Sequence, residues 1–302
     1  MILMEEYHNP VLLKESVDGL NIKPDGVYVD VTFGGGGHSR EILNRLGEKG
    51  RLYAFDQDED ALENVIDDPR FNLINENFRF IKRFLRFHNV KKVDGILGDF
   101  GVSSHQFNVA ERGFSTRFEA KLDMRMSQKS NLSAFEVINE YDHEQLKKLF
   151  FEYADLRNAS KIASAIVKAR EEASIVSSEQ LKEVLQPFLF KEKEHKILAQ
   201  IYQAIRIEVN QEIAVLKEFL LQTEELLGKG GRISLISYHS LEDRLVKRYI
   251  RSGLFEGEPE KDFYGNINVP FKKVGGLVVP SADEIYKNNR ARSAKLRIAA
   301  KL

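Results

Sequence analysis

The first part of the chain alternates between two hydrophobic periods. Short apolar runs of strand length occur at 27–31, 51–56, 71–75 and 93–99. Between them, apolar residues recur three and four positions apart, as in amphipathic helices, at 38–46, 60–66 and 78–88. Strands that alternate with helices predict an α/β fold with a doubly wound, mostly parallel sheet, whose ligands bind beyond the carboxyl ends of the strands.

A different period follows the fourth predicted strand. Residues 102–125 form a polar segment that reads as a long loop, of the kind that is either functional or disordered. The spacing after it is helical, and three pairs match the capping box: Ser133 with Glu136, Asp142 with Gln145, and Ser177 with Gln180. We therefore predict an inserted all-helical domain at 106–208, which interrupts an α/β domain formed by 1–105 and 209–302.

The strand-and-helix pattern returns near the carboxyl terminus. Helical spacing at 211–227 precedes a fifth strand at 232–237, and we expect Ser240 to cap the helix that follows. Residues 253–265 are rich in turn formers and predict no element. Alternating apolar residues at 294–298 predict a half-buried final strand.

A glycine loop directly follows the first predicted strand. Gly34 to Gly37 lead into a predicted helix, so backbone N–H groups and a positive helix end are available to a nucleotide-like ligand. Ser39 occupies the third small position of the dinucleotide fingerprint, and the sequence contains no G-x-x-x-x-G-K-[ST] phosphate loop. An acid followed by three residues and then G-x-G, as in Asp30 to Gly36, is typical of Rossmann-like enzymes that use S-adenosylmethionine. A tight turn that needs positive φ angles is the structural alternative.

Three predicted strands end in an aspartate: Asp30, Asp56 and Asp99. Asp56 lies about 20 residues past the glycines, the separation at which an acid meets ribose hydroxyls. The alternative is that Asp56 caps the next helix, a task for which Asp58 would serve as well. Because parallel strands end at one edge of a sheet, we expect the three acids to share that rim, which packing alone explains poorly.

Composition narrows the classes of function. The 302 residues are 42% hydrophobic and 30% charged, as in ordinary globular proteins, and the net charge of −1 excludes a uniformly basic nucleic-acid coat. The absence of cysteine excludes disulfides, thiolate zinc sites and thiol nucleophiles, and no metal site is expected. Neither a targeting signal nor a membrane span is visible, so we expect a soluble cytoplasmic protein that does not bind membranes.

Residues 78–88 combine basic and aromatic side chains. Arg79, Lys82, Arg83 and Arg86 alternate with phenylalanines in a helical pattern. Such interleaving is consistent with RNA binding. The pattern favours the alternative, a helix that packs on the sheet and turns a solvated basic side outward.

Several unusual motifs occur in one order along the chain. They comprise His8 with 10–13, 30–39, Asp99 with 101–104, 111–115, 122–126, 203–210, 239–244 and 290–293. Together they resemble the RsmH (MraW) family of bacterial methyltransferases over nearly the whole chain. Members of that family methylate N4 of a cytosine in the decoding region of small-subunit (16S) ribosomal RNA.

The resemblance implies a Rossmann-like methyltransferase fold with a helical substrate domain inserted after the fourth strand. It also implies that S-adenosylmethionine is the cofactor, with contacts from Gly36, Gly37, His38, Asp56, Phe78, Asp99 and Gln106. The implied partner is 16S ribosomal RNA in an assembled or nearly assembled small subunit, and a homodimer is left open.

The chemistry of amine methylation singles out Asp99. The exocyclic amine of cytosine is a poor nucleophile, so a carboxylate that accepts its hydrogen bonds and orients it promotes transfer. His239 follows the fifth predicted strand and either reaches the site or anchors hydrogen bonds locally. Arg112, Asp123 and Arg125 either bind substrate phosphates and close the pocket or pair with one another structurally.

Two other functions compete with an RNA methyltransferase. The strand–glycine–helix–acid pattern is shared with nicotinamide-dependent oxidoreductases, although Ser39 weakens that match. A non-catalytic RNA-binding assembly factor with a decayed pocket is the third hypothesis, and the retained glycines and acids argue against it. For the methyltransferase, the target base must leave its stack, while the helical insert holds the surrounding RNA through shape and phosphate contacts.

Overall fold

A computed structural model describes residues 10–190, 192–265 and 267–302. The chain forms two compact units, one of Met1–Gly101 with Ile213–Leu302 and one of Val102–Glu212. The predicted boundaries, after 105 and after 208, each lie four residues from these. His8, which belongs to the motifs of the resemblance, lies outside the described residues.

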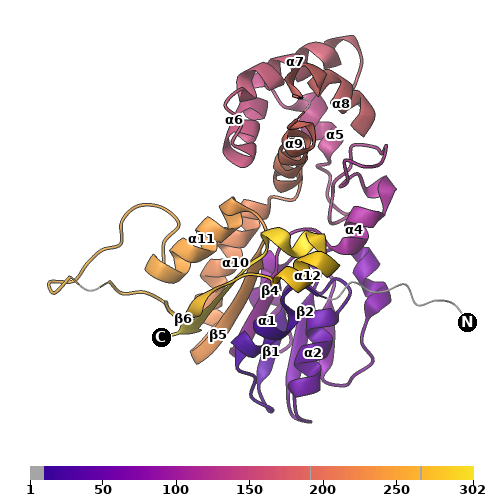
Figure 1. Cartoon of the computed structure of the whole chain (residues 1–302). Helices are drawn as coiled ribbons and strands as arrows, with labels where there is room; N and C mark the ends of the chain where they lie inside the picture. The colour runs from indigo at the N-terminus through magenta and orange to yellow at the C-terminus, as the bar shows by residue number, and fades with distance from the viewer. Residues whose placement is uncertain (1–9, 191, 266) are drawn as a thin grey trace, which may run out of the picture. The chain divides into compact units, whose positions relative to one another are not determined.

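The first unit is built on a seven-stranded sheet in the order β3-β2-β1-β4-β5-β7-β6 (Figure 1). Its strands are β1 Val27–Asp30, β2 Arg51–Phe55, β3 Phe71–Ile74, β4 Val93–Asp99, β5 Leu227–Ser237, β6 Phe271–Val278 and β7 Lys295–Lys301. Strands β1 to β5 pair in parallel, and β7 runs antiparallel to both β5 and β6. The prediction of a mostly parallel, doubly wound sheet is confirmed. The strand order reverses between β1 and β4, and ligands bind at such a switch point.

Edge strand β6 was not predicted. Its sequence, FKKVGGLV, is mostly exposed and has no regular alternation of apolar and polar residues. Its register comes instead from antiparallel pairing with β7, which a one-dimensional pattern does not reveal. Lys272 and Lys273 on this exposed edge strand also discourage pairing with other chains.

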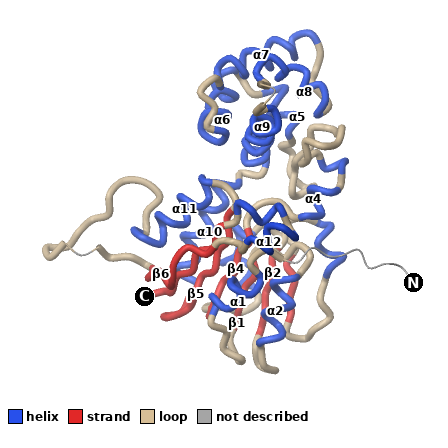
Figure 2. Tube along the Cα trace, in the orientation of Figure 1, coloured by secondary structure: helices blue, strands red, loops and turns tan. Residues whose placement is uncertain are grey.

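Helices cover both faces of the sheet in this unit (Figure 2). They are α1 Leu13–Leu20, α2 Gly37–Arg45, α3 Ile81–Phe87, α10 Glu212–Leu226, α11 Ser240–Ser252 and α12 Ala282–Lys287, with 3-10 turns η1 Glu59–Asn64, η2 Phe78–Phe80 and η5 Asn289–Ser293. Apolar residues of α1 and α2 pack with Tyr28 and Leu97, whereas those of α3, α10 and α11 pack with Val29 and Ile96. Because successive strand residues point to opposite faces, adjacent positions feed two separate cores.

The second unit is helical. It contains α4 Ser104–Asn108, η3 Ala110–Arg112, α5 Ala134–Glu140, α6 His143–Ala154, α7 Ala159–Glu172, α8 Ser178–Leu185, η4 Gln186–Phe188 and α9 Glu194–Val209. All three predicted capping boxes are confirmed, with Ser133, Asp142 and Ser177 as the N-cap residues. The segment predicted as a long loop contains α4 and η3, because Ser103 and Gln106 form a fourth capping box.

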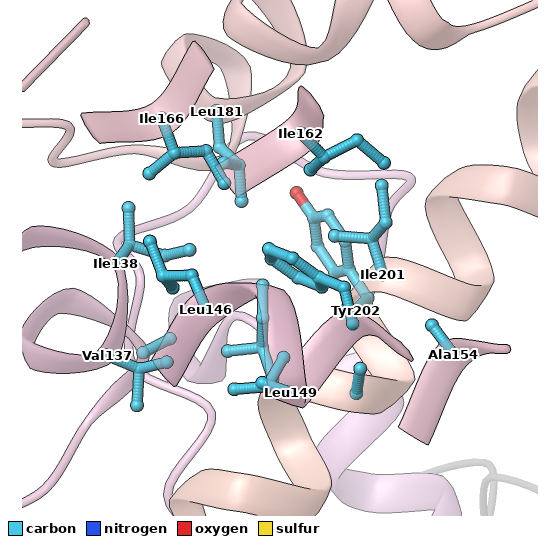
Figure 3. Packing of buried hydrophobic residues seen from close by; sticks show 14 of the residues in the cluster. Val137, Ile138, Leu146, Leu149, Ala154, Ile162, Ile166, Leu181, Ile201 and Tyr202 are labelled. Atoms are coloured by element: carbon cyan, nitrogen blue, oxygen red, sulfur yellow. The ribbon is translucent and has the colours of Figure 1, made fainter. Parts of the chain in front are cut away.

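This unit has its own hydrophobic core (Figure 3). Ile138, Leu146, Ile162 and Ile201 come from four different helices and are fully buried together. Tyr202 lies at the same core and donates its hydroxyl to the carbonyl of Ser178 at 3.4 Å, which satisfies its polar atom. Among the helices of the described residues, none is long and apolar enough to cross a membrane.

Candidate active site

The glycine turn joins the carboxyl end of β1 to α2. Gly34 and Gly36 have φ angles of 51° and 75°, in the left-handed region that favours glycine. A Cβ atom on Gly37 would lie 2.1 Å from Cγ of Pro10, so this position excludes a side chain. Gly36 is the N-cap of α2 and no described side chain caps that first turn, which leaves backbone donors for a ligand. The backbone angles and close contacts of the turn therefore require glycine, and its backbone N–H groups remain available to a ligand.

Asp30 braces this turn from inside the protein. It is fully buried, and its Oδ2 accepts a hydrogen bond from the Ser39 hydroxyl at 2.7 Å, while Oδ1 accepts from the Thr32 N–H at 3.1 Å. Burial raises the pKa of Asp30 to about 6, and these hydrogen bonds limit the rise. Asp30 therefore has a structural role among the three strand-end acids, and the Ser39 hydroxyl is its side-chain partner.

Asp56 ties the end of β2 to the same turn. Its Oδ2 accepts from the Gly34 N–H at 2.7 Å and its Oδ1 from the Asp58 N–H at 2.9 Å. Burial raises the pKa of Asp56 to about 6. The N-cap of η1 is Asp58, which accepts from the Asp60 N–H, so the alternative that Asp56 caps this segment is wrong. Each Asp56 oxygen retains a second lone pair for a further donor.

Asp99 ends β4 among three polar neighbours. The Tyr238 hydroxyl donates to Asp99 Oδ1 at 2.8 Å, and the Asp99 N–H donates to Thr32 Oγ1 at 2.6 Å. His38 is buried and donates from Nε2 to the Val11 carbonyl at 3.2 Å. Burial raises the pKa of Asp99 to about 6, against the opposing effects of His38 and Tyr238. Burial also lowers the pKa of His38.

Tyr238 was not predicted from the sequence. It follows β5, which lies beside β4 in the sheet, and that adjacency was the available signal. Burial and the charge of Asp99 raise the pKa of the Tyr238 hydroxyl well above its ordinary value, so this group stays a donor. The backbone N–H of Tyr238 donates to Glu242 Oε2 at 3.0 Å, which fixes the backbone from which the tyrosine side chain extends.

His239 is the N-cap of α11, and the predicted cap, Ser240, is wrong. His239 Nδ1 accepts from the Glu242 N–H and Glu242 Oε2 accepts from the His239 N–H, both at 3.4 Å. The side chain that returns to the cap belongs to Glu242, three residues after His239, so the helix begins one residue earlier than predicted. His239 therefore has the local anchoring role that was one of its two interpretations.

Phe78 lies in a cluster of three aromatic rings. Its ring centroid is 5.9 Å from that of Phe100 and 5.3 Å from that of Phe219, which it meets edge-on. Phe100 directly follows Asp99 and is buried, a position that the sequence reasoning did not single out. The cluster provides an apolar aromatic wall close to the strand ends.

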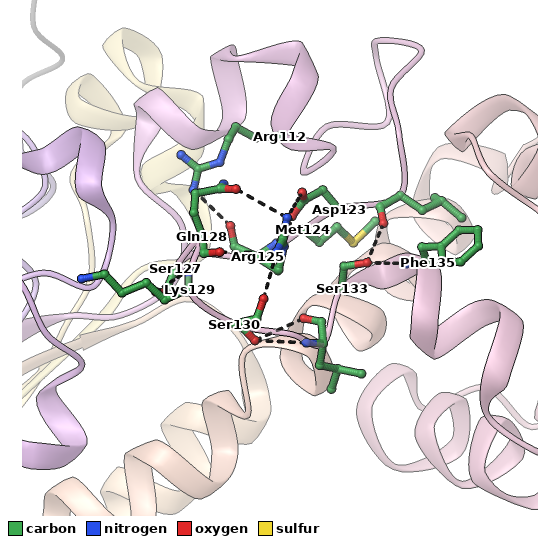
Figure 4. Close-up of polar contacts among 12 residues, drawn as sticks. Arg112, Asp123, Met124, Arg125, Ser127, Gln128, Lys129, Ser130, Ser133 and Phe135 are labelled. Carbon is green, nitrogen blue, oxygen red and sulfur yellow. Dashed lines mark hydrogen bonds and ion pairs between the residues drawn. The ribbon is translucent and has the colours of Figure 1, made fainter.

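The remaining candidates belong to the second unit (Figure 4). Arg125 forms a bidentate pair with Asp123 through Nε–Oδ1 at 2.9 Å and Nη2–Oδ2 at 2.7 Å. Arg112 is buried and donates from Nη2 to the carbonyls of Arg125 and Met126. Burial opposes ionisation of Asp123, but hydrogen bonds from Arg125 hold its pKa below the ordinary value. The structure thus brings these three together in the structural network that was one alternative.

Gln106 is also committed locally. Its side-chain Oε1 accepts from the Ser103 N–H at 3.0 Å, and its backbone N–H donates to Ser103 Oγ at 3.2 Å, which together cap α4. The side chain is buried. A cofactor contact from Gln106 stays a prediction.

The fold and the site define a class of protein. A 3-2-1-4-5-7-6 strand order with a reversed seventh strand is that of Rossmann-like, S-adenosylmethionine-dependent methyltransferases. The residues present fit this cofactor. The open backbone amides at the start of α2 suit its carboxylate, and the strand-end carboxylates suit its ribose hydroxyls and its sulfonium. The aromatic wall suits its adenine.

The family model described as the MraW methylase family matches residues 5–302, and the chain belongs to this family. It is 77% identical over 302 residues to a protein of Christiangramia forsetii, with 100% of both chains covered. It is 68% identical to one of Flavobacterium johnsoniae (98% of both chains) and 55% identical to one of Bacteroides thetaiotaomicron (98% of this chain, 97% of the other). All three relatives are named ribosomal RNA small subunit methyltransferase H. The predicted family and enzyme class are confirmed, which decides against an oxidoreductase.

Proposed function

We propose that this methyltransferase transfers a methyl group from S-adenosylmethionine to N4 of a cytidine in the decoding region of 16S ribosomal RNA. The observation that carries the proposal is the environment of Asp99, a half-buried carboxylate at the end of β4 whose Oδ1 accepts a hydrogen bond from Tyr238. The nitrogen of an exocyclic amine is a weak nucleophile whose lone pair is delocalised into the ring, so methyl transfer to it is helped by a carboxylate that accepts its hydrogen bonds. The names of the relatives support the RNA substrate.

The cofactor is held by the turn and the strand ends. The backbone donors of Gly36, Gly37 and His38 bind anionic or carbonyl groups, and Asp56 accepts from the ribose hydroxyls with its remaining lone pairs. Phe78 packs against the adenine. S-adenosylmethionine, when bound, supplies an electrophilic methyl group on a positively charged sulfur.

Asp99 acts on the target amine. Its ionised carboxylate accepts a hydrogen bond from the amine N–H and turns the nitrogen lone pair toward the donor. The methylated nitrogen carries a positive charge and must lose a proton. A carboxylate with a pKa of about 6 accepts that proton readily, because protonated N4 of cytosine is a far stronger acid. Asp99 is therefore the proposed catalytic residue, and Tyr238 positions it.

The second unit binds the RNA around the target, which leaves its stack to reach the pocket. Arg112, Asp123 and Arg125 order the segment that carries them, because each guanidinium already has protein acceptors. The proposed substrate is an assembled or nearly assembled small subunit in the cytoplasm, where ribosomes are built.

The test offers labelled S-adenosylmethionine to small subunits that lack the modification and maps the product nucleotide by mass spectrometry. We expect one methylated cytidine, with the label on N4. Asp99→Asn should retain its fold and transfer the methyl group about 10²–10⁴-fold more slowly, whereas the exposed control Asp25→Asn should behave as wild type.

Three results would contradict the proposal. Label on protein or on carbon 5 of a pyrimidine would exclude the substrate assignment. A wild-type rate in Asp99→Asn with normal cofactor affinity would exclude its catalytic role. Failure of the wild-type protein to bind S-adenosylmethionine in calorimetry would favour an assembly factor with a decayed pocket.

A further inference from the structure

The segment from 77 to 92 is one of two strongly basic stretches of the catalytic unit, the other being 286–301. The 77–92 segment contains no acidic residue, although the whole chain has nearly equal numbers of basic (45) and acidic (46) residues. Its six basic residues are Arg79, Lys82, Arg83, Arg86, Lys91 and Lys92. Four phenylalanines are interleaved with them, at 78, 80, 84 and 87. Turn η2 and helix α3 occupy most of this segment.

One side of α3 serves the fold. Ile81 and Leu85 are fully buried in the core between the sheet and α10. Arg79 pairs with Glu218 at 2.5 Å and Lys82 pairs with Glu225, both of which belong to α10. A helix packed on the sheet thus explains two of the cations and the inner apolar residues.

The other side of α3 remains unexplained by packing. Phe80, Arg83 and Phe87 stand at i, i+3 and i+7, so they form one stripe along the helix, and Arg86 adjoins Phe87. Phe80 is 41% exposed and Phe87 is 79% exposed. Within the described residues, neither Arg83 nor Arg86 forms a direct ion pair: Arg83 lies over the Phe84 ring at 5.9 Å, and Arg86 acts on Glu225, the partner of Lys82, only through its charge. Exposed aromatic rings that flank guanidinium groups without a direct ion pair suit a partner that offers both flat apolar rings and negative charge.

We propose that this stripe of Phe80, Arg83, Arg86 and Phe87 is a binding surface for single-stranded RNA. The phenylalanine rings stack on unpaired bases and the arginines contact phosphates, the combination that single-strand-binding proteins use. Each nucleotide of a single strand carries both an anionic phosphate and a flat base, so it matches the arginines and the two exposed rings together. The inference rests on the proposed function, because that function makes RNA the substrate.

The position of the stripe supports this assignment. Turn η2 begins at Phe78, in the aromatic cluster by the strand ends, and α3 follows it without a break. The seven residues of α3 extend over about 10 Å from that point. Nucleotides flanking the target base would therefore run along α3 on the catalytic unit itself, in addition to any contacts made by the helical unit.

The test measures binding of an unmodified single-stranded RNA fragment of the target region by fluorescence anisotropy over a range of salt concentrations. Arg83→Gln/Arg86→Gln should weaken binding and lower the slope of log affinity against log salt by about 1.4, because two phosphate contacts are lost. Phe87→Leu keeps an apolar side chain but removes the stacking ring, and should weaken binding about fivefold or more. Affinity for S-adenosylmethionine should not change in either variant.

Matched controls remove equivalent groups elsewhere on the same unit. Lys49→Gln/Lys272→Gln removes two exposed cations from the turn before β2 and from edge strand β6, and Phe263→Leu alters a ring that is 97% exposed. Both controls should bind RNA as wild type does. Ultraviolet crosslinking followed by peptide mapping should place RNA on the α3 peptide.

The outcomes separate this inference from the proposed function. If wild type methylates subunits while the α3 variants match the controls in affinity and salt slope, the RNA-binding stripe is wrong and the function stands. If the variants lose subunit binding but bind the RNA fragment normally, the stripe contacts a protein and the inference is overturned. If wild type neither binds nor methylates RNA, the proposed function itself fails.

Discussion

Replacement of Tyr238 by phenylalanine removes one hydroxyl beside Asp99 and keeps the rest of the ring. That hydroxyl donates to Asp99 Oδ1 at 2.8 Å and so stabilises the carboxylate over the protonated acid. A hydrogen bond to a charged group contributes about 1.5–3 kcal/mol. At 1.36 kcal/mol for each tenfold change in protonation, its loss raises the pKa of Asp99 from about 6 to roughly 7–8.

The consequence is a shifted pH profile. About nine-tenths of Asp99 is ionised at pH 7 in the wild type, but only about a tenth to a half would be ionised in Tyr238→Phe. If the ionised form accepts the amine proton, kcat/KM at pH 7 falls roughly two- to tenfold and recovers near pH 9. The assay is methyl transfer to small subunits from about pH 5 to about pH 9.5.

Tyr28→Phe is the matched control. The Tyr28 hydroxyl is also buried in the first unit and accepts from the Lys23 N–H at 2.7 Å, with no contact to Asp99. This variant should lose stability without a shift in the pH profile. A Tyr238→Phe profile that overlays the wild type, or one that is lowered equally at every pH, would refute the reasoning.

Three further expectations concern stability, measured by urea or thermal unfolding. Gly37→Ala should destabilise the protein by about 1–3 kcal/mol because its Cβ would meet Pro10, whereas Gly228→Ala, with no atom closer than 3.9 Å, should cost less than about 1 kcal/mol. Ser133→Ala should cost about 1 kcal/mol through loss of the α5 capping box, and no loss would contradict that role. Between about pH 4 and about pH 6, Asp30 keeps a proton in the folded protein that it releases in the unfolded chain. The free energy of unfolding of the wild type should therefore fall as pH rises through this range, by at most about 3 kcal/mol relative to Asp30→Asn. A rise of the free energy of unfolding over the same range would exclude the raised pKa.

Local patterns in the sequence were sufficient for most elements and for several caps. The capping boxes of Ser133, Asp142 and Ser177 join residues only three positions apart, so spacing alone identifies them. The strand that ends at Asp99 was bounded correctly because its apolar run is continuous in a sheet that is covered on both faces. The start of α11 was missed by one residue because His239 and Ser240 are both capable caps, and the choice depends on Glu242.

Only the tertiary structure decided what each strand-end acid does. Asp30, Asp56 and Asp99 look alike in the sequence. In the structure, both oxygens of Asp30 accept hydrogen bonds within the turn and the start of α2, and Asp56 links the turn to the end of β2. Asp99 instead accepts a hydrogen bond from the Tyr238 hydroxyl. That last partner lies 139 residues away, and the whole helical unit intervenes between them. A hydrogen bond is decided by distance in space, so the pairing of β4 with β5 assigned these roles, and neither composition nor spacing contains that information.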